Sequence, residues 1–82
     1  MDKSYPQITI YTRPWCGNSM LAKRWMDQRG IPYIEIDISQ NREAARYVEE
    51  LNGGYQSVPT ILFDGVYVAT EPSPAELEEL LG

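Results

Sequence analysis

The sequence contains no histidine and only one cysteine, Cys16. Without histidine there is no Cys-His or Ser-His nucleophile pair, and too few soft ligands remain for a mononuclear zinc site, so we expect no bound metal. A single cysteine cannot form a disulfide within the chain. This excludes a disulfide-stapled secreted fold and favours a reducing, cytoplasmic location. Cys16 is therefore the first residue to consider for any chemistry of this protein.

The chain also lacks long hydrophobic runs and an excess of basic residues. No apolar run approaches the roughly 18–20 residues of a membrane span, and Met1–Pro6 shows no signal-peptide-like stretch, so we expect no membrane partner. Twelve acidic residues against seven basic ones give a net charge of −5, which disfavours nucleic acid as a partner. The 82 residues, 43% of them hydrophobic, predict one globular domain over 1–82.

Alternating apolar and polar residues predict two strands in the first half of the chain, over 7–12 and 33–38. The second strand is predicted to face inward through its isoleucines, Ile34, Ile36 and Ile38. A helical pattern follows each strand, the first from Gly17 towards Gly30 and the second from a cap at Ser39 or Asn41 towards 52–54. The apolar stripes of the two helices are Ala22, Trp25 and Met26, and Ala44, Val48 and Leu51.

The second half of the chain predicts a hairpin and a last helix. Strands over 60–63 and 66–70 flank Asp64-Gly65, a strong hairpin signal. Ser73-Pro74-Ala75-Glu76 is a capping box with proline at the first helical position, and it opens a helix with Leu77, Leu80 and Leu81 inward. The first β-α-β unit requires parallel strands joined by a right-handed crossover. The order β-α-β-α-β-β-α thus predicts an α/β fold in which three helices cover a four-stranded mixed sheet.

Cys16 lies where the first predicted strand gives way to the first helix. Unpaired backbone N–H groups and the helix dipole favour an anion at that point, and a nearby cation such as Arg13 would add to the effect. A cysteine in this setting is stabilised as the thiolate, which is the nucleophilic form. A free cysteine is more often a small buried hydrophobe. Here the flanking turn and cap residues, Pro14, Gly17, Asn18 and Ser19, favour a reactive thiol.

Two segments in register resemble the glutaredoxin family. Residues 11–19, Tyr-Thr-Arg-Pro-Trp-Cys-Gly-Asn-Ser, resemble the glutaredoxin active-site loop, and Ser57-Val58-Pro59-Thr60 resembles the segment with the family's cis-proline. Within the family the chain is most similar to mycoredoxins and other short glutaredoxin-like proteins, through Trp15-Cys16-Gly17, Asn52-Gly53-Gly54 and Thr70-Glu71-Pro72-Ser73. The resemblance covers nearly the whole chain and implies the thioredoxin-like fold.

The resemblance implies a thiol–disulfide oxidoreductase that reduces mixed disulfides between proteins and a low-molecular-weight thiol. That thiol would be the co-substrate of a monomeric enzyme without a tightly bound cofactor. Cys16 would be the attacking thiolate, and the Val58 backbone beside a cis Pro59 would pair with the incoming chain. The remaining substrate-binding positions would be Arg13, Trp15, Gly17 and Asn18 at the entrance and Thr70 and Glu71 on the far wall. Trp15 could stack on a substrate or belong partly to the core.

Two departures from the family pattern bear on the mechanism. Ser19 stands where most mycoredoxins and dithiol glutaredoxins have a second, resolving cysteine. The chain is therefore either a natural monothiol enzyme or a variant whose resolving cysteine was replaced. Ala69-Thr70-Glu71 stands where glutathione-using members have a Gly-Gly pair followed by Asp or Ser. The small thiol is thus open between mycothiol, bacillithiol and glutathione, and we expect a sugar thiol to be preferred.

Two other functions are open from the sequence. The Cys-Gly-Asn-Ser motif is similar to the Cys-Gly-Phe-Ser of glutaredoxins that share an iron–sulfur cluster between two subunits, although the insertion that precedes their motif is absent here. An interaction module without redox activity is the other alternative, and its Cys16 would have ordinary thiol reactivity.

Overall fold

The computed structural model describes residues 5–82. Two predictions, the single domain over 1–82 and the lack of a signal-peptide-like stretch at the start of the chain, include residues 1–4. These four residues lie outside the described residues. Seven elements follow one another in the predicted order: β1 (Ile8–Thr12), α1 (Gly17–Gln28), β2 (Ile34–Asp37), α2 (Arg42–Leu51), β3 (Thr60–Phe63), β4 (Tyr67–Thr70) and α3 (Pro74–Leu81). No helix within 5–82 is long and apolar enough to cross a membrane.

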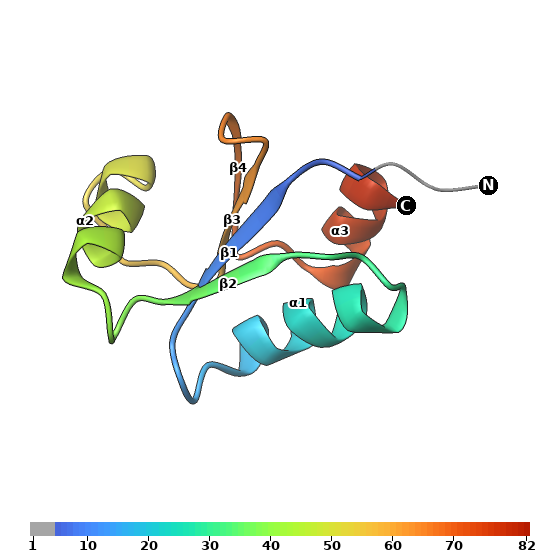
Figure 1. The fold of residues 1–82 in the computed structure, drawn as a ribbon, viewed down its shortest axis with the longest axis horizontal. Helices are drawn as coiled ribbons and strands as arrows, with labels where there is room; N and C mark the ends of the chain where they lie inside the picture. Colours follow the sequence, from blue (N-terminus) through green and yellow to red (C-terminus); the bar gives the residue numbers. More distant parts are fainter. Residues whose placement is uncertain (1–4) are drawn as a thin grey trace.

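The strands form one mixed sheet in the order β2-β1-β3-β4. β1 pairs parallel with β2 and antiparallel with β3, and β3 pairs antiparallel with β4. Helices α1 and α3 lie on one face of the sheet and α2 lies on the other (Figure 1). This arrangement confirms the predicted four-stranded mixed sheet covered by three helices.

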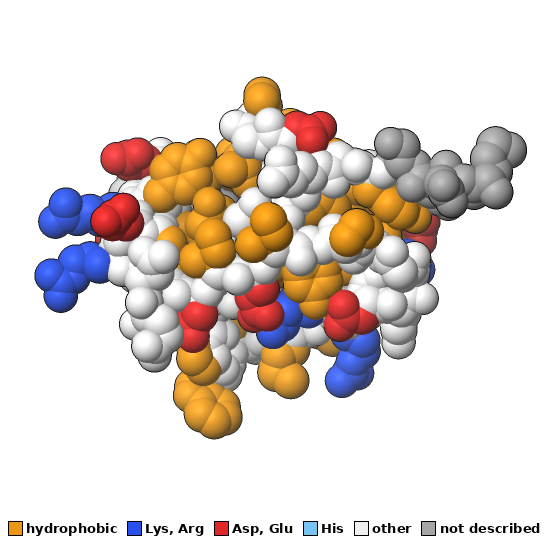
Figure 2. All heavy atoms as spheres, viewed as in Figure 1, with side chains coloured by type: hydrophobic (Ala, Val, Ile, Leu, Met, Phe, Trp, Pro, Cys, Tyr) orange, Lys and Arg blue, Asp and Glu red, His pale blue; other side chains and the backbone are white. Residues whose placement is uncertain are grey.

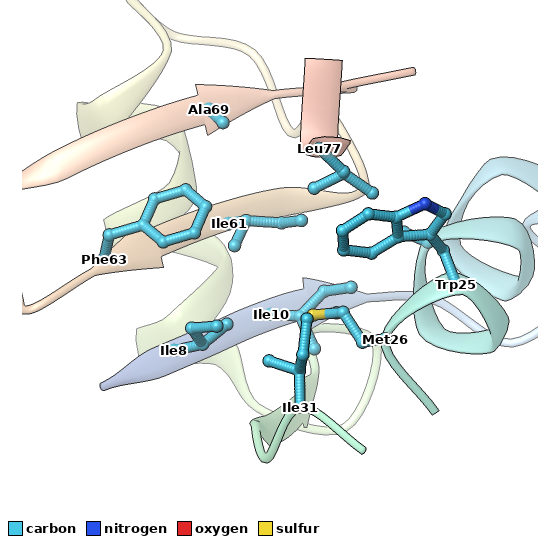
Figure 3. Close-up of a cluster of buried hydrophobic side chains, with 10 residues drawn as sticks. Ile8, Ile10, Trp25, Met26, Ile31, Ile61, Phe63, Ala69 and Leu77 are labelled. Atoms are coloured by element: carbon cyan, nitrogen blue, oxygen red, sulfur yellow. The ribbon is translucent and has the colours of Figure 1, made fainter. Parts of the chain in front are cut away.

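The sheet separates two hydrophobic clusters, because successive side chains of a strand point to opposite faces. The larger cluster lies between the sheet and helices α1 and α3 (Figure 3); its buried members are Ile8, Ile10, Ala22, Trp25, Met26, Ile31, Ile61, Phe63, Ala69 and Leu77. The smaller cluster lies under α2 and consists of Tyr11, Ile38, Ala44, Val48 and Leu62. Trp25 is therefore part of the core.

Specific side chains and glycines set the ends of the helices. Asn41 caps α2 by accepting a hydrogen bond from the Ala44 N–H at 3.0 Å, whereas the alternative cap, Ser39, donates to Asp37 instead. Ser73 opens α3 in a complete capping box. After α2 the chain turns at Gly53 with φ of +68°, the left-handed conformation that a side chain would disfavour.

The structure corrects two predicted inward faces. Ile34 is 51% exposed, because β2 is an edge strand and Ile34 is its first residue; of the three isoleucines, only Ile38 is fully buried. Leu80 is 40% exposed. Leu77 and Leu81 are four residues apart and share the line of α3 that faces the sheet, and Leu80 lies beside that line. The last strand is also shorter than predicted, since Val66 belongs to the turn.

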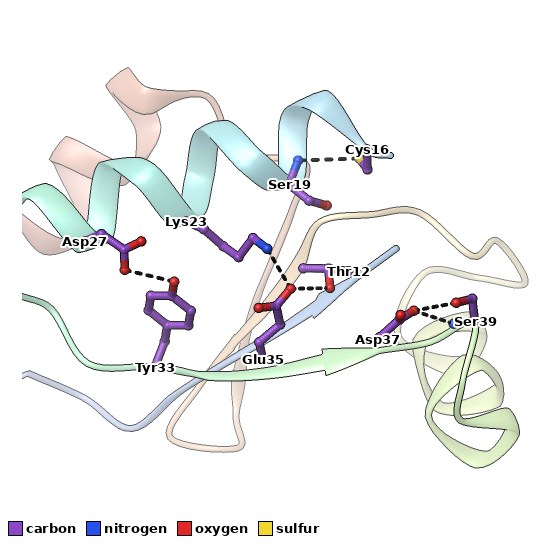
Figure 4. Close-up of polar contacts among 9 residues, drawn as sticks. All are labelled: Thr12, Cys16, Ser19, Lys23, Asp27, Tyr33, Glu35, Asp37 and Ser39. Atoms are coloured by element: carbon purple, nitrogen blue, oxygen red, sulfur yellow. Dashed lines mark hydrogen bonds and ion pairs between the residues drawn. The ribbon is translucent and has the colours of Figure 1, made fainter. Parts of the chain in front are cut away.

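A polar contact ties α1 to the end of β1 and to the edge strand (Figure 4). The Lys23 ammonium lies 2.7 Å from Glu35 Oε2, and the buried Thr12 hydroxyl donates to the same oxygen at 2.9 Å. The hydrogen bond from Lys23 holds the pKa of Glu35 below its ordinary value. The carboxylate is thus favoured in the folded state, so this contribution to stability is present above the ordinary carboxylate pKa and is lost as the pH falls.

The two clusters and the edge strand predict unequal costs for two isoleucine substitutions. Ile10 is fully buried in the larger cluster, so Ile10→Ala is expected to lower the free energy of unfolding by about 2–5 kcal/mol. Ile34→Ala removes the same atoms from a half-exposed site and is expected to cost about 1 kcal/mol or less. Urea unfolding of both variants measures the difference. Equal losses would contradict the exposure of Ile34.

Candidate active site

Cys16 is the N-cap of α1, as its place between strand and helix predicts. Its backbone is extended, with φ of −93° and ψ of 111°, and its carbonyl accepts the N–H of Met20. The backbone N–H of Ser19 donates to Cys16 Sγ at 3.4 Å (Figure 4). The sulfur therefore occupies the position that a Ser or Asp oxygen takes at other helix starts, and an unpaired donor of the first turn points at it.

The loop before β3 lies against this sulfur. The Cys16 thiol donates to the Val58 carbonyl at 3.7 Å, although the two residues are 42 positions apart in the chain. The Val58–Pro59 peptide bond is cis, as the resemblance predicts. The Pro59 carbonyl in turn accepts the N–H of Glu71 at 2.8 Å. The structure thus brings together Cys16, Val58, Pro59 and Glu71 from three segments of the chain.

Asn52 holds the far wall in place. The Thr70 hydroxyl donates to Asn52 Oδ1 at 2.5 Å, and the Asn52 amide donates to the Val48 carbonyl at 2.9 Å and to the Thr60 hydroxyl at 3.1 Å. One side chain therefore joins the end of α2 to β3 and β4. The sequence identified Asn52 as the end of a helix and, in Asn52-Gly53-Gly54, as part of the resemblance to mycoredoxins, but it did not indicate that Asn52 holds this wall.

Arg13, which the sequence suggested as a cation near Cys16 and as an entrance residue, makes its side-chain hydrogen bond to Gln56. Its guanidinium donates to Gln56, and the Gln56 amide donates to Glu49 at 2.6 Å. This chain of contacts links the loop before Cys16 to the loop before Val58, and it places Arg13 at the entrance without contact to the sulfur in the described hydrogen bonds. Gln56 was missed from the sequence, where only its position two residues before Val58 could have indicated it.

Trp15 stands out from the surface next to the cysteine. It is 98% exposed, which excludes a place in the core, and its φ is +69°. Gly17, Asn18 and Met20 beside it are exposed as well. Figure 2 shows apolar side chains projecting from the lower edge of the molecule, where Figure 1 places α1 and the loop before it. Left-handed backbone in a residue other than glycine is uncommon, and here both Trp15 and Glu71, with φ of +49°, flank the site.

Ser19 is buried directly behind the sulfur. It is 1% exposed, and three residues after the N-cap it lies on the same side of the first helical turn as Cys16. Its backbone serves Cys16, whereas its hydroxyl oxygen has no hydrogen-bond partner among the residues that the structure describes. Within 5–82, no three His, Cys, Asp or Glu side chains are grouped as a metal ion would require.

Comparisons with known proteins agree with this geometry. The glutaredoxin family model matches residues 8–68. A Mycobacterium tuberculosis protein named as a glutaredoxin is 40% identical over 74 residues, 90% of this chain and 88% of its own length. Mycoredoxin 1 of Corynebacterium glutamicum is 34% identical over 70 residues, 85% of this chain and 86% of its own. The solved structure of the glutaredoxin-like NrdH-redoxin of Escherichia coli has a TM-score of 0.75 at 28% identity and covers 90% of this chain and 93% of its own.

The thioredoxin-like fold and the glutaredoxin resemblance inferred from the sequence are both confirmed by these matches. Members of the matched family exchange thiols and disulfides with low-molecular-weight thiols and protein disulfides. A redox-inactive interaction module is accordingly the wrong class for this protein. The chain belongs to the glutaredoxin family of thiol–disulfide oxidoreductases.

Proposed function

We propose that the protein reduces mixed disulfides between proteins and a low-molecular-weight thiol through a monothiol cycle of Cys16. The observation that carries this proposal is the position of Cys16 Sγ, between the Ser19 N–H and the Val58 carbonyl and next to cis Pro59. Three residues after Cys16 in the chain stands Ser19, so no second thiol is present at that position.

In the first step the Cys16 thiolate attacks the small-thiol sulfur of the mixed disulfide. A new disulfide forms between Cys16 and the small thiol, the old one breaks, and the protein leaves as a thiolate that takes a proton from water. The Ser19 N–H and the positive end of the α1 dipole stabilise the attacking thiolate. The Cys16 thiol, which donates a hydrogen bond to the Val58 carbonyl, would lose its proton to solvent before the attack.

In the second step a free small-thiol thiolate attacks the small-thiol sulfur bound to Cys16. The symmetric small-thiol disulfide leaves, and the electron pair of the broken bond returns to Cys16 as a thiolate. A resolving cysteine would compete with this step by forming an internal disulfide, and Ser19 cannot. The cycle is therefore complete with Cys16 and two molecules of small thiol.

The walls of the site suggest how the substrates are held. The Val58 backbone beside Pro59 would pair with the extended chain of the small thiol, and Arg13, fixed by Gln56, would supply a positive charge at one end. Gly17 and Asn18 at the exposed helix start leave room for the protein partner, and Trp15 offers it an apolar surface.

The far wall favours a sugar-bearing thiol such as mycothiol. Glu71 is exposed, its backbone N–H donates to the Pro59 carbonyl, and its carboxylate would repel a carboxylate of glutathione. Sugar hydroxyls can instead donate to Glu71 and to the Thr70 oxygen, whose own hydrogen is taken up by Asn52. A relative that is named mycoredoxin 1 points in the same direction.

The proposed function predicts turnover of a peptide that carries mycothiol in a mixed disulfide. With free mycothiol present, the wild-type protein is expected to release the peptide thiol, and Cys16→Ala is expected to fall to the uncatalysed rate. Peptide thiol release, followed by chromatography, measures both. Equal rates with the two proteins would overturn the proposal. A brown protein after anaerobic purification would indicate the iron–sulfur carrier instead.

Replacing the buried Ser19 with cysteine is expected to give the protein an internal disulfide. Positions 16 and 19 lie on one side of the first helical turn, so Ser19→Cys is expected to form a disulfide within the monomer under mild oxidation. Thiol titration should show the loss of two thiols, and a non-reducing gel should show no dimer. The control, Ser19→Cys combined with Cys16→Ser, keeps one thiol and should not lose it. Two free thiols after oxidation would contradict the described loop geometry.

The charge of Glu71 on the far wall predicts a preference for mycothiol over glutathione. Release of the adduct from Cys16 is expected to be faster with mycothiol than with glutathione at equal thiolate concentration. Glu71→Gln removes the repulsion and should raise the glutathione rate severalfold. Glu50→Gln, which removes the same charge from the exposed side of α2, should leave both rates unchanged. A wild-type advantage for glutathione would show that this wall does not select the thiol.

A further inference from the structure

The two open edges of the sheet, β2 and β4, differ in how they are protected against another strand. Natural proteins protect such an edge with a proline or with charged side chains. β2 comes shortly after Pro32 and carries Glu35 and Asp37, whereas the four residues of β4, Tyr-Val-Ala-Thr, include neither a proline nor a charge. Within residues 5–82, no backbone hydrogen bond other than those to β3 involves positions 67–70. β4 is therefore the edge that can accept a further strand.

A groove of about 250 Å³ lies between β4 and α3, which stand side by side in Figure 1. It is lined by the four residues of β4 and by Glu76, Glu79 and Leu80 of α3. Tyr67, 56% exposed, and Leu80, 40% exposed, give the groove apolar surface. Glu76 and Glu79 are exposed, and neither forms an ion pair with a basic residue in the described part of the chain. The groove thus combines an apolar surface with negative charge.

These charges indicate which kind of chain fits the groove. A second copy of this protein would bring its own Glu76 and Glu79 to the same surface, and each copy carries a net charge of −5, so the two would repel. In an added strand, side chains at alternate positions would face α3. An apolar side chain there would pack on Leu80 and Tyr67, and a lysine or arginine two positions along would pair with a glutamate. An extended segment with apolar and basic side chains therefore fits the groove.

We propose that β4 binds an extended, apolar and basic segment of the substrate protein by strand addition. The inference rests on the proposed function, because the segment belongs to the protein whose mixed disulfide is reduced. β4 ends at Thr70, and the backbone N–H of the following Glu71 donates to the Pro59 carbonyl beside Cys16. A segment on β4 therefore has one end next to that site, separate from the Val58 backbone that would hold the small thiol. Binding there would raise the local concentration of the mixed disulfide at Cys16.

The first test measures binding of two synthetic peptides that contain no cysteine. The basic peptide, Val-Thr-Lys-Thr-Val-Thr-Lys, places valine and lysine on one face of a strand, and the acidic peptide has glutamate in place of each lysine. The basic peptide is expected to shift the amide resonances of residues 67–70 and to slow their hydrogen exchange, and the acidic peptide is expected to do neither. Glu79→Lys should weaken binding of the basic peptide severalfold. The matched control, Glu50→Lys, makes the same change of charge on the exposed side of α2 and should bind like the wild type.

The second test adds to each peptide a cysteine that carries mycothiol in a mixed disulfide. The basic segment is expected to give a severalfold lower KM than the acidic segment at the same kcat, and Glu79→Lys should remove this advantage. Equal KM values for the two peptides would overturn the inference. Binding of the peptides without cysteine involves no thiol chemistry. Failure of the proposed function in the turnover assay is therefore distinguishable from failure of this inference.

The binding measurements can also overturn the inference. They do so if residues 67–70 show no shift at concentrations of the basic peptide up to about 1 mM, if the two peptides bind equally, or if Glu79→Lys and Glu50→Lys weaken binding to the same extent. Sedimentation of the free protein as a dimer, with slow exchange at residues 67–70, would likewise contradict it, because a second copy would then occupy the groove.

Discussion

The hydrogen bond from the Ser19 N–H to Cys16 Sγ joins the fold of this protein to its chemistry. The same sulfur caps α1 and belongs to the one cysteine of the sequence, so the start of the helix and the thiol cannot move independently. The cap depends in turn on a fixed end of β1. At that end the buried Thr12 hydroxyl donates a hydrogen bond to Glu35. The Glu35 carboxylate also forms an ion pair with Lys23 of α1.

The strand order decides which loops meet at that sulfur. β1 and β3 pair antiparallel with Tyr11 opposite Thr60, so β3 starts at the edge of the sheet where β1 ends. β4 returns to the same edge, with Thr70 opposite Thr60. The chain before Thr60 therefore supplies Val58 and Pro59, and the chain after Thr70 supplies Glu71. A hairpin on the other side of the sheet would leave Cys16 with neither wall.

Charge divides the site into two unlike walls. Arg13 is held at the entrance by Gln56, and Glu71 stands exposed beside Pro59. Under the proposed function, a carboxylate of the substrate would be favoured on the first side and disfavoured on the second, whereas neutral hydroxyls would be accepted on both. For this reason the proposed small thiol has an uncharged, hydroxyl-rich end and not carboxylates at both ends. Trp15 lies outside these walls and is almost fully exposed.

Local signals in the sequence determined the helices and strands of this protein, because caps, glycine turns and apolar spacing act over a few residues. The capping box at Ser73, the turn at Asp64-Gly65 and the junction of strand and helix at Cys16 are all found where they were predicted. The exposure of Ile34 was not predictable in this way, since only the sheet order makes β2 an edge. The partners of Arg13, Thr70 and Cys16 are 43, 18 and 42 residues away in the chain. The sequence by itself therefore determined which residue can supply a thiol, and only the tertiary structure decided what surrounds it, because contacts at such separations exist only after the strands have paired.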